Sequence, residues 1–147
     1  MIKVSIDCDP VLEPPNNGIV FELVLLTLNN HNFKKSDITI IFGNDSLLTK
    51  LKKEFFQKDQ LTDVIAFRLN DYELPEIEGE IYISLPRAKE NAKLYKETYD
   101  KEILRLIVHG CLHLIGFDDR TKLEKLEMTT MENKVLKLFK HENIFED

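Results

Sequence analysis

The sequence has little of what extracellular, fibrous and membrane proteins require. Cys8 and Cys111 are its two cysteines, and they form neither a CxxC pair nor a disulfide framework, which suits a reducing compartment. Five glycines and five prolines in 147 residues exclude collagen-like and low-complexity character. The longest apolar-rich run, residues 19–28, contains Glu22 and Thr27 and is too short to span a bilayer. The first residues also lack the apolar core of a signal peptide. We therefore expect a soluble cytoplasmic protein with no membrane partner.

Positive charge is also scarce. The chain has 20 lysines and arginines against 26 aspartates and glutamates, so its formal net charge is −6. This balance excludes a generally basic, DNA-coating protein, and we expect no DNA partner; any nucleic-acid contact is confined to a local patch that works against the net field. The length predicts one domain over residues 1–147, because a chain of this size buries roughly 70% of the surface that its unfolded form exposes.

Apolar residues alternate with polar ones in some segments and recur at helical spacing in others. The alternation predicts strands over residues 2–6, 37–42, 62–67 and 78–84. The helical spacing predicts helices over residues 19–30, from Asp45 or Ser46 onward, and over 86–99, 102–115 and 122–139. Strands and helices alternate early and helices dominate later, so we expect an α+β fold: a small four-stranded mixed sheet packed with about five helices.

Two of the four histidines lie four residues apart in the most apolar predicted helix. His109 and His113 therefore share one helix face about one turn apart, and both imidazoles can reach one metal ion. Gly116 follows on the same stripe, where a glycine ends a helix with a positive φ. The chain then folds back and brings Asp119 round as a third ligand. Three protein ligands leave a fourth position for water, which predicts a catalytic zinc site at the end of this buried helix. Cys111 lies roughly 200° round the helix from His109 and is expected to pack in the core.

These residues also have purely structural interpretations. A histidine pair at this spacing is often two hydrogen-bonded core residues, and either Asp118 or Asp119 could cap the next helix. The other two histidines, His31 and His141, are expected to be solvated surface residues.

The spacing from His109 to Asp119 resembles the HExxHxxGxxH motif of metzincin metalloproteases, in which the glutamate after the first histidine is the general base. Here that position is Gly110. Without the carboxylate, the protease mechanism lacks its proton shuttle. A zincin-like metalloprotease is therefore the second candidate function.

Another resemblance covers most of the chain. Residues 109–119, HGCLHLIGFDD, resemble the HGxLHLxGYDH signature of the YbeY family, bacterial endoribonucleases of ribosomal RNA maturation. Residues 62–67, TDVIAF, are similar to the family's TDVLSFP segment, and residues 79–84, GEIYIS, are similar to its GDIxIS strand. Residues 87–92 then follow as in the family. Three motifs in the same order are far more specific than one histidine pair.

The resemblance implies a cytoplasmic, zinc-dependent, single-strand-specific endoribonuclease. Its implied partners are ribosomal RNA precursors and the small ribosomal subunit, in rRNA maturation and small-subunit quality control. It implies one Zn²⁺ per chain on His109, His113 and Asp119, with metal-activated water or hydroxide at the scissile phosphate. A third candidate function is a non-catalytic ribosome-assembly factor whose metal is structural.

The chain departs from the family pattern at three places. The third ligand is usually histidine and here is Asp119, which is still a competent zinc ligand. Arg68 replaces the usual proline after the TDV segment. A Tyr-Arg pair is common before that segment, where this chain has Phe55 and Phe56. A guanidinium able to hold phosphate is thus missing, and Lys58 or Arg68 is the candidate replacement.

Two further residues are candidates for the reaction. Glu80, at the Asp position of the GDI motif, is a candidate catalytic carboxylate or a solvated strand residue. Arg87 is a candidate catalytic contact to phosphate, or it pairs with Glu90 or Asn91 on its own helix.

Basic residues near the site and in the first half of the chain bear on RNA binding. Arg105, one turn before His109, flanks the cleft or pairs with Glu102. Because RNA binding has to overcome the net charge, we expect a weak, salt-sensitive affinity for isolated RNA. The clustered lysines of the first half are Lys34, Lys35, Lys50, Lys52, Lys53 and Lys58.

Overall fold

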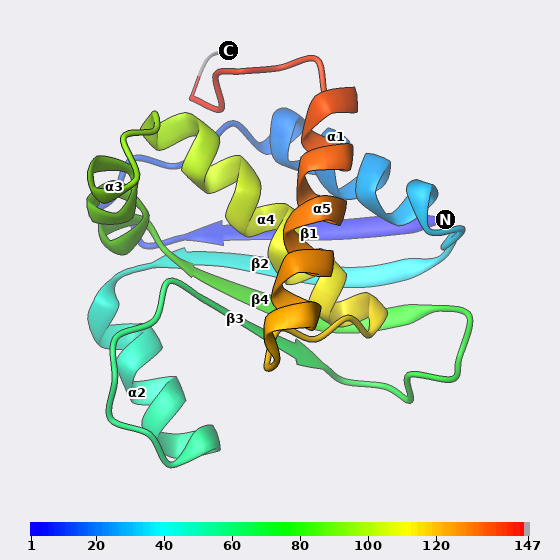
Figure 1. Ribbon diagram of the computed structural model, residues 1–147, viewed down its shortest axis with the longest axis horizontal. Coiled ribbons are helices and arrows are strands. Elements are labelled where there is room, and N and C mark those ends of the chain that lie inside the picture. The colour runs from blue at the N-terminus through cyan, green and yellow to red at the C-terminus, as the bar shows by residue number, and fades with distance from the viewer. Residues whose placement is uncertain (146–147) are drawn as a thin grey trace.

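A computed structural model describes residues 1–145 of the chain. The elements run in the order β1 (Ile2–Cys8), α1 (Asn17–Asn30), β2 (Ser36–Gly43), α2 (Asp45–Phe56), β3 (Val64–Arg68), β4 (Ile77–Ser84), α3 (Leu85–Leu94), α4 (Tyr99–Ile115) and α5 (Lys122–Leu138). In Figure 1, α4 and α5 cross in front of the strands, α1 lies near the top, and α2 lies at the lower left, below β3. The predicted α+β fold with a four-stranded mixed sheet and five helices is confirmed.

The sheet has the strand order β1-β2-β4-β3. β1 pairs with β2 and β2 with β4 in parallel, whereas β3 pairs with β4 antiparallel, so β3 is a short edge strand. Ile40 of β2 and Ile81 of β4 lie in register and are fully buried. Because side chains alternate along a strand, Glu80 and Tyr82 of β4 point to the opposite face, where they are partly exposed.

Helix α4 lies at the centre of the core. It contacts α1, α3, α5, β3 and β4. Thr98 caps its N-terminus by accepting a hydrogen bond from the Lys101 amide. Gly110 lets the helix approach the sheet, since a Cβ there would lie 2.7 Å from Cγ2 of Ile81. Cys111 is fully buried, as predicted. None of the helices in residues 1–145 combines the length and the apolar composition that a membrane span requires.

The boundary between α3 and α4 differs from the prediction. A single helix was expected to reach Tyr99 and the next to begin at Glu102, whereas α3 ends at Leu94 and Tyr99 opens α4. Between them Lys96 adopts a φ of 55°. A glycine would mark a left-handed backbone position in the sequence, but a lysine does not. The residue pattern therefore does not reveal this break.

Candidate metal centre

Two imidazoles of α4 point at one another on its exposed side. Nε2 of His109 lies 3.0 Å from Nε2 of His113, and the two ring centroids are 4.6 Å apart. A carboxylate of the following loop meets both rings: Oδ2 of Asp119 is 3.3 Å from Nε2 of His109, and Oδ1 is 3.6 Å from Nε2 of His113. One ligand atom from each of the three residues fits within a 4.8 Å span. The structure therefore brings together the three predicted ligands.

The path from α4 to Asp119 depends on the end of the helix. Gly116 has a φ of 126°, and its amide donates to the carbonyls of Leu112 and His113. The next amide, of Phe117, also donates to Leu112, which closes the helix end. Thr121 then caps α5 in a reciprocal capping box with Glu124. The helix ends at Gly116, as predicted, and the ligand loop lies between two capped helix ends.

The structure distinguishes the two neighbouring aspartates. Asp119 faces the histidines, whereas Asp118 pairs with the exposed Arg120 at 3.6 Å. Neither aspartate caps α5, because Thr121 does so. The choice of Asp119 over Asp118 agrees with this geometry.

The donor set fits a zinc ion. Ligands at about 2.1 Å from a tetrahedral zinc are roughly 3.4 Å apart, and the three separations here are 3.0, 3.3 and 3.6 Å. Two imidazole nitrogens and one carboxylate oxygen are ordinary zinc ligands. A tetrahedral zinc held by these three residues would keep a fourth position for water.

A carboxylate that the sequence analysis did not identify contacts His109 at the ring nitrogen opposite the other two ligands. Oε2 of Glu132, on α5, lies 2.6 Å from Nδ1 of His109, and its side chain is 6% exposed. Arg105 donates to Oε1 of Glu132 at 2.8 Å and to Asn133 at 2.7 Å. The expected pairing of Arg105 with Glu102 is therefore wrong, because the guanidinium reaches across to α5.

The environment shifts the pKa values of the two histidines in opposite directions. Burial lowers the pKa of His109, but the hydrogen bond and the charge of Glu132 outweigh it and raise this pKa above its ordinary value. Burial and the neighbouring His109 lower the pKa of His113. The lowered pKa of His113 favours the neutral form that binds a metal, whereas the raised pKa of His109 makes a metal compete with a proton for that ring.

Asp63, immediately before β3, is a partly buried carboxylate of this region. Burial raises its pKa, and the nearby charge of His109 partly offsets that rise. Its Oδ2 accepts a hydrogen bond from Asn91 of α3 at 3.0 Å. Asp63 belongs to the TDV motif. Nothing in the spacing of that motif from the histidines indicated that Asp63 would interact with His109.

The two candidate catalytic residues form their contacts with residues other than the three ligands, and their roles in the reaction stay predictions. Glu80 lies on the sheet face opposite α4 and accepts a hydrogen bond from the hydroxyl of Tyr82 at 3.2 Å. Arg87 forms an ion pair with Asp45 of α2 at 2.8 Å, and Ser84 donates to the same carboxylate. The expected pairing of Arg87 on its own helix is wrong, since α2 supplies its partner.

The guanidinium of Arg68 is engaged in structural hydrogen bonds and is not free to bind phosphate. It donates to the carbonyls of Leu114, Asp71 and Glu76 and stacks over Tyr72. It thereby ties the loop between β3 and β4 to the last turn of α4. The prediction that Arg68 replaces a missing phosphate contact is therefore not supported by its contacts.

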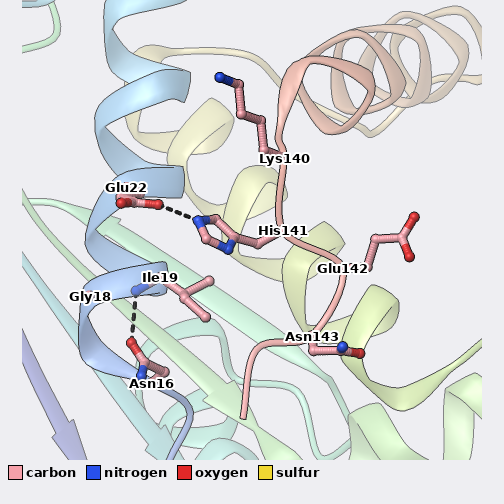
Figure 2. A pocket seen from close by; sticks show the side chains of 8 residues that line it. All are labelled: Asn16, Gly18, Ile19, Glu22, Lys140, His141, Glu142 and Asn143. Carbon is pink, nitrogen blue, oxygen red and sulfur yellow. Dashed lines mark hydrogen bonds and ion pairs between the residues drawn. The ribbon is translucent and has the colours of Figure 1, made fainter. Parts of the chain in front are cut away.

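The two other histidines have defined partners. His31 packs edge-on against Phe117 with its Nε2 buried, so the expectation of a solvated ring is wrong there. His141 is half-exposed and lies 2.7 Å from Glu22. Figure 2 shows the pocket beside it, between the first turn of α1 and residues 140–143, with none of the three ligands in its lining.

Comparisons with known proteins agree with the motifs. A family model described as "Endoribonuclease YbeY" matches residues 16–140. A protein named endoribonuclease YbeY from Chloroherpeton thalassium is 39% identical over 118 residues, which cover 80% of this chain and 82% of that protein. Another of that name from Flavobacterium psychrophilum is 39% identical over 111 residues, covering 75% and 77%. The solution structure of TM1509 from Thermotoga maritima has a similar fold, with a TM-score of 0.61 at 23% identity over 94% of this chain and 91% of that one. The predicted resemblance is confirmed, and the chain belongs to the endoribonuclease YbeY family.

Proposed function

We propose that this chain is a zinc-dependent, single-strand-specific endoribonuclease that matures ribosomal RNA at the small ribosomal subunit in the cytoplasm. The observation that carries the proposal is the convergence of His109, His113 and Asp119 in a chain of this family. One domain over residues 1–147 performs the reaction and takes part in small-subunit quality control.

Zinc is the metal that best matches the ligands. Two imidazoles and one carboxylate leave a fourth position open, which is typical of catalytic rather than structural zinc sites. A bound zinc ion supplies Lewis acidity, which lowers the pKa of water to about 7 and polarises a phosphoryl oxygen.

The chain's own residues prepare this site. Glu132 accepts a hydrogen bond from the protonated Nδ1 of His109. In this tautomer the lone pair of Nε2 faces His113 and Asp119. Glu132 and Asp119 place negative charge on two sides of His109. Metal binding neutralises part of this concentrated negative charge.

The geometry argues against the metalloprotease alternative. A protease of this type needs a glutamate in the position of Gly110, directed at the metal. Gly110 instead faces the sheet, where even a Cβ would lie 2.7 Å from Ile81. A side chain at that position can neither fit nor reach the ligands.

The experiment that tests the proposal compares single-stranded RNA with a duplex of the same sequence. Protein loaded with one equivalent of zinc is expected to cut the single strand and leave the duplex intact. His113→Ala and Asp119→Asn lose both the zinc and the cleavage, whereas the matched neighbour Asp118→Asn keeps both. The chemical form of the new RNA ends then distinguishes attack by water from attack by the 2′-hydroxyl.

Other outcomes would contradict the proposal. Chelation should abolish cleavage while the far-UV circular dichroism stays unchanged; a loss of helix signal in a protein that never cuts RNA indicates a structural metal. Fragments of casein without cleavage of RNA indicate the protease. In cells, His113→Ala should cause unprocessed small-subunit rRNA to accumulate, and normal rRNA would refute the maturation role.

A further inference from the structure

Four aromatic rings form a continuous cluster on the side of the sheet away from α4. Phe67 of β3 is its centre: Phe55 packs edge-on against it at 5.3 Å between centroids, Phe56 stacks with it at 5.9 Å, and Tyr82 meets it edge-on at 5.9 Å. We call these four side chains the aromatic platform. The four rings come from α2, β3 and β4, so the platform forms only when the tertiary structure brings these three elements together.

The platform is open to solvent. Phe55 is 56% exposed and Phe56 is 42% exposed at the end of α2. Leu48 is the buried residue of α2, and the last turn of this helix meets β3 through the two phenylalanine rings. Figure 1 shows α2 below β3. Large adjacent rings that stay exposed to water are typical of a binding surface.

Positive charge is interleaved with these rings. Nζ of Lys52 lies 4.6 Å from the centroid of the Phe56 ring, in a cation–π contact. Residues 50–61 hold four lysines against one glutamate and one aspartate, a net charge of +2 in a chain whose total is −6. Cores of protein–protein interfaces are depleted in lysine, whereas surfaces for single-stranded nucleic acid combine stacking rings with a cationic path for the phosphates.

One nearby group opposes anion binding. Glu80 lies beside Phe67 in the antiparallel register and accepts a hydrogen bond from Tyr82. Its charge reduces the local attraction for phosphate, so stacking has to supply much of the affinity. This favours unpaired bases over a duplex, in which the base faces are covered.

The platform and the metal centre flank the same strand. α4 contacts β3 on one face of the sheet, while α2 contacts it from the other. Arg68, at the end of β3, donates to the carbonyl of Leu114, one residue after the second ligand. An RNA strand that passes round this short edge can therefore meet both.

We propose that the aromatic platform stacks unpaired bases of single-stranded RNA while Lys52 and its neighbours contact the phosphates. This proposal rests on the proposed ribonuclease function, because it places substrate RNA beside the metal centre. It also gives a physical reason why a net acidic chain can hold RNA although Arg68, Arg87 and Arg105 are already engaged with other groups of the protein.

The absence of tryptophan from the chain permits a direct test of stacking. Phe56→Trp introduces a single tryptophan, whose fluorescence is quenched when a base stacks on it. We expect an oligouridylate of about 12 nucleotides to quench it, within the site sizes known for such surfaces. An abasic ribose-phosphate chain of the same length should not quench it. Equal quenching by both, or by neither, would overturn the proposal.

Affinity measurements on the full chain test the same surface. Fluorescence anisotropy with labelled oligouridylate is measured in EDTA, so that binding is observed without cleavage. The double variant Phe55→Leu/Phe56→Leu keeps the apolar bulk but is expected to bind about tenfold more weakly, the size of one lost base stack. The matched control is Tyr95→Leu, which removes an exposed ring that also lies beside lysines but outside the platform. It should leave affinity unchanged.

Salt dependence separates the two contributions. Lys52→Gln should reduce the slope of log affinity against log salt by about 0.7, the value for one phosphate contact on a single strand. The phenylalanine variants should lower affinity by the same factor at every salt concentration. If the double variant leaves RNA affinity unchanged and instead converts a dimer to a monomer in sedimentation, the platform is an interface between copies and the proposal is wrong.

The failures of the two proposals are distinguishable. A protein that binds RNA through the platform but never cleaves it refutes the ribonuclease function alone. A protein that cleaves single strands, but whose double variant binds and cleaves like the wild type, refutes the platform alone.

Discussion

His109 is engaged at both of its ring nitrogens. Nδ1 faces the buried carboxylate of Glu132, and Nε2 faces the other two ligands. Arg105 holds that carboxylate in turn, so the orientation of the imidazole is set by a chain of charged contacts between α4 and α5. A carboxylate behind a ligating histidine fixes the tautomer and increases the basicity of the ligand.

Replacing this carboxylate should weaken metal binding specifically. We expect Glu132→Gln to lower the zinc affinity about 10- to 100-fold, because the amide keeps the shape but lacks the charge that favours the ligating tautomer. Competition with a chromophoric zinc chelator measures the change. Glu127→Gln, which alters an exposed carboxylate of the same helix, is the control and should bind zinc like the wild type. Equal affinities in all three proteins would remove Glu132 from the metal centre.

At the scale of the elements, the end of α4 decides where the third ligand lies. A Cβ on Gly116 would meet the ring of Tyr72 at 3.6 Å, an ordinary contact, so space is available for a larger residue. The requirement is the backbone φ of 126°, which residues with a side chain rarely adopt.

Gly116→Ala should therefore cost both stability and metal affinity. We expect the free energy of unfolding to fall by about 1–2 kcal/mol, the cost of a left-handed conformation in a residue with a Cβ. Zinc affinity should fall further, because relaxation of the helix end displaces Asp119. Urea denaturation without and with zinc measures the two effects. A variant as stable as the wild type would show that the φ at this position is not a constraint.

The elements were predictable to the extent that their signals are local. Alternation and helical spacing identify the four strands and five helices, and a glycine marks the end of α4. The break after Leu94 was missed because the residue pattern gives no signal for the positive φ of Lys96. His109, His113 and Asp119 were accessible because they lie within eleven residues of one another.

Contacts between distant segments could not be predicted in this way. Glu132 is 23 residues from His109 and belongs to a helix whose alternating charges predict a solvated face. The partner of Arg87 comes from α2, 42 residues earlier. Which face of the sheet Glu80 occupies depends on the register of β4 against its neighbours. These facts follow from the assembled tertiary structure.

At the scale of the whole molecule, one buried carboxyl links overall stability to pH. Glu102 is 6% exposed, and burial raises its pKa from 4.5 to about 7. The charges of Asp63, Glu97 and Glu132 act in the same direction, and Arg105 opposes them. The folded state therefore holds a proton that the unfolded chain releases between these two pKa values. The stabilisation is present at pH 4.5 and below and is lost as the pH rises through about 7.

Glu102→Gln should remove this dependence. Relative to the variant, the wild type should lose about 2–3 kcal/mol of unfolding free energy between pH 4.5 and pH 8. Urea denaturation of the metal-free proteins in chelator measures it, so that zinc-linked protons do not contribute. We expect one cooperative transition throughout, as for a single domain. Parallel pH profiles for the two proteins would refute the assignment to Glu102.

The order of the metal-centre residues along the chain has a consequence for synthesis. The sheet is complete at Ser84, and both histidines follow on α4, but Asp119 and Glu132 come later still. A chain that leaves the ribosome from its N-terminus can therefore form its sheet before it can hold a metal. The residues of the candidate metal centre are therefore all present only after α5 has been translated.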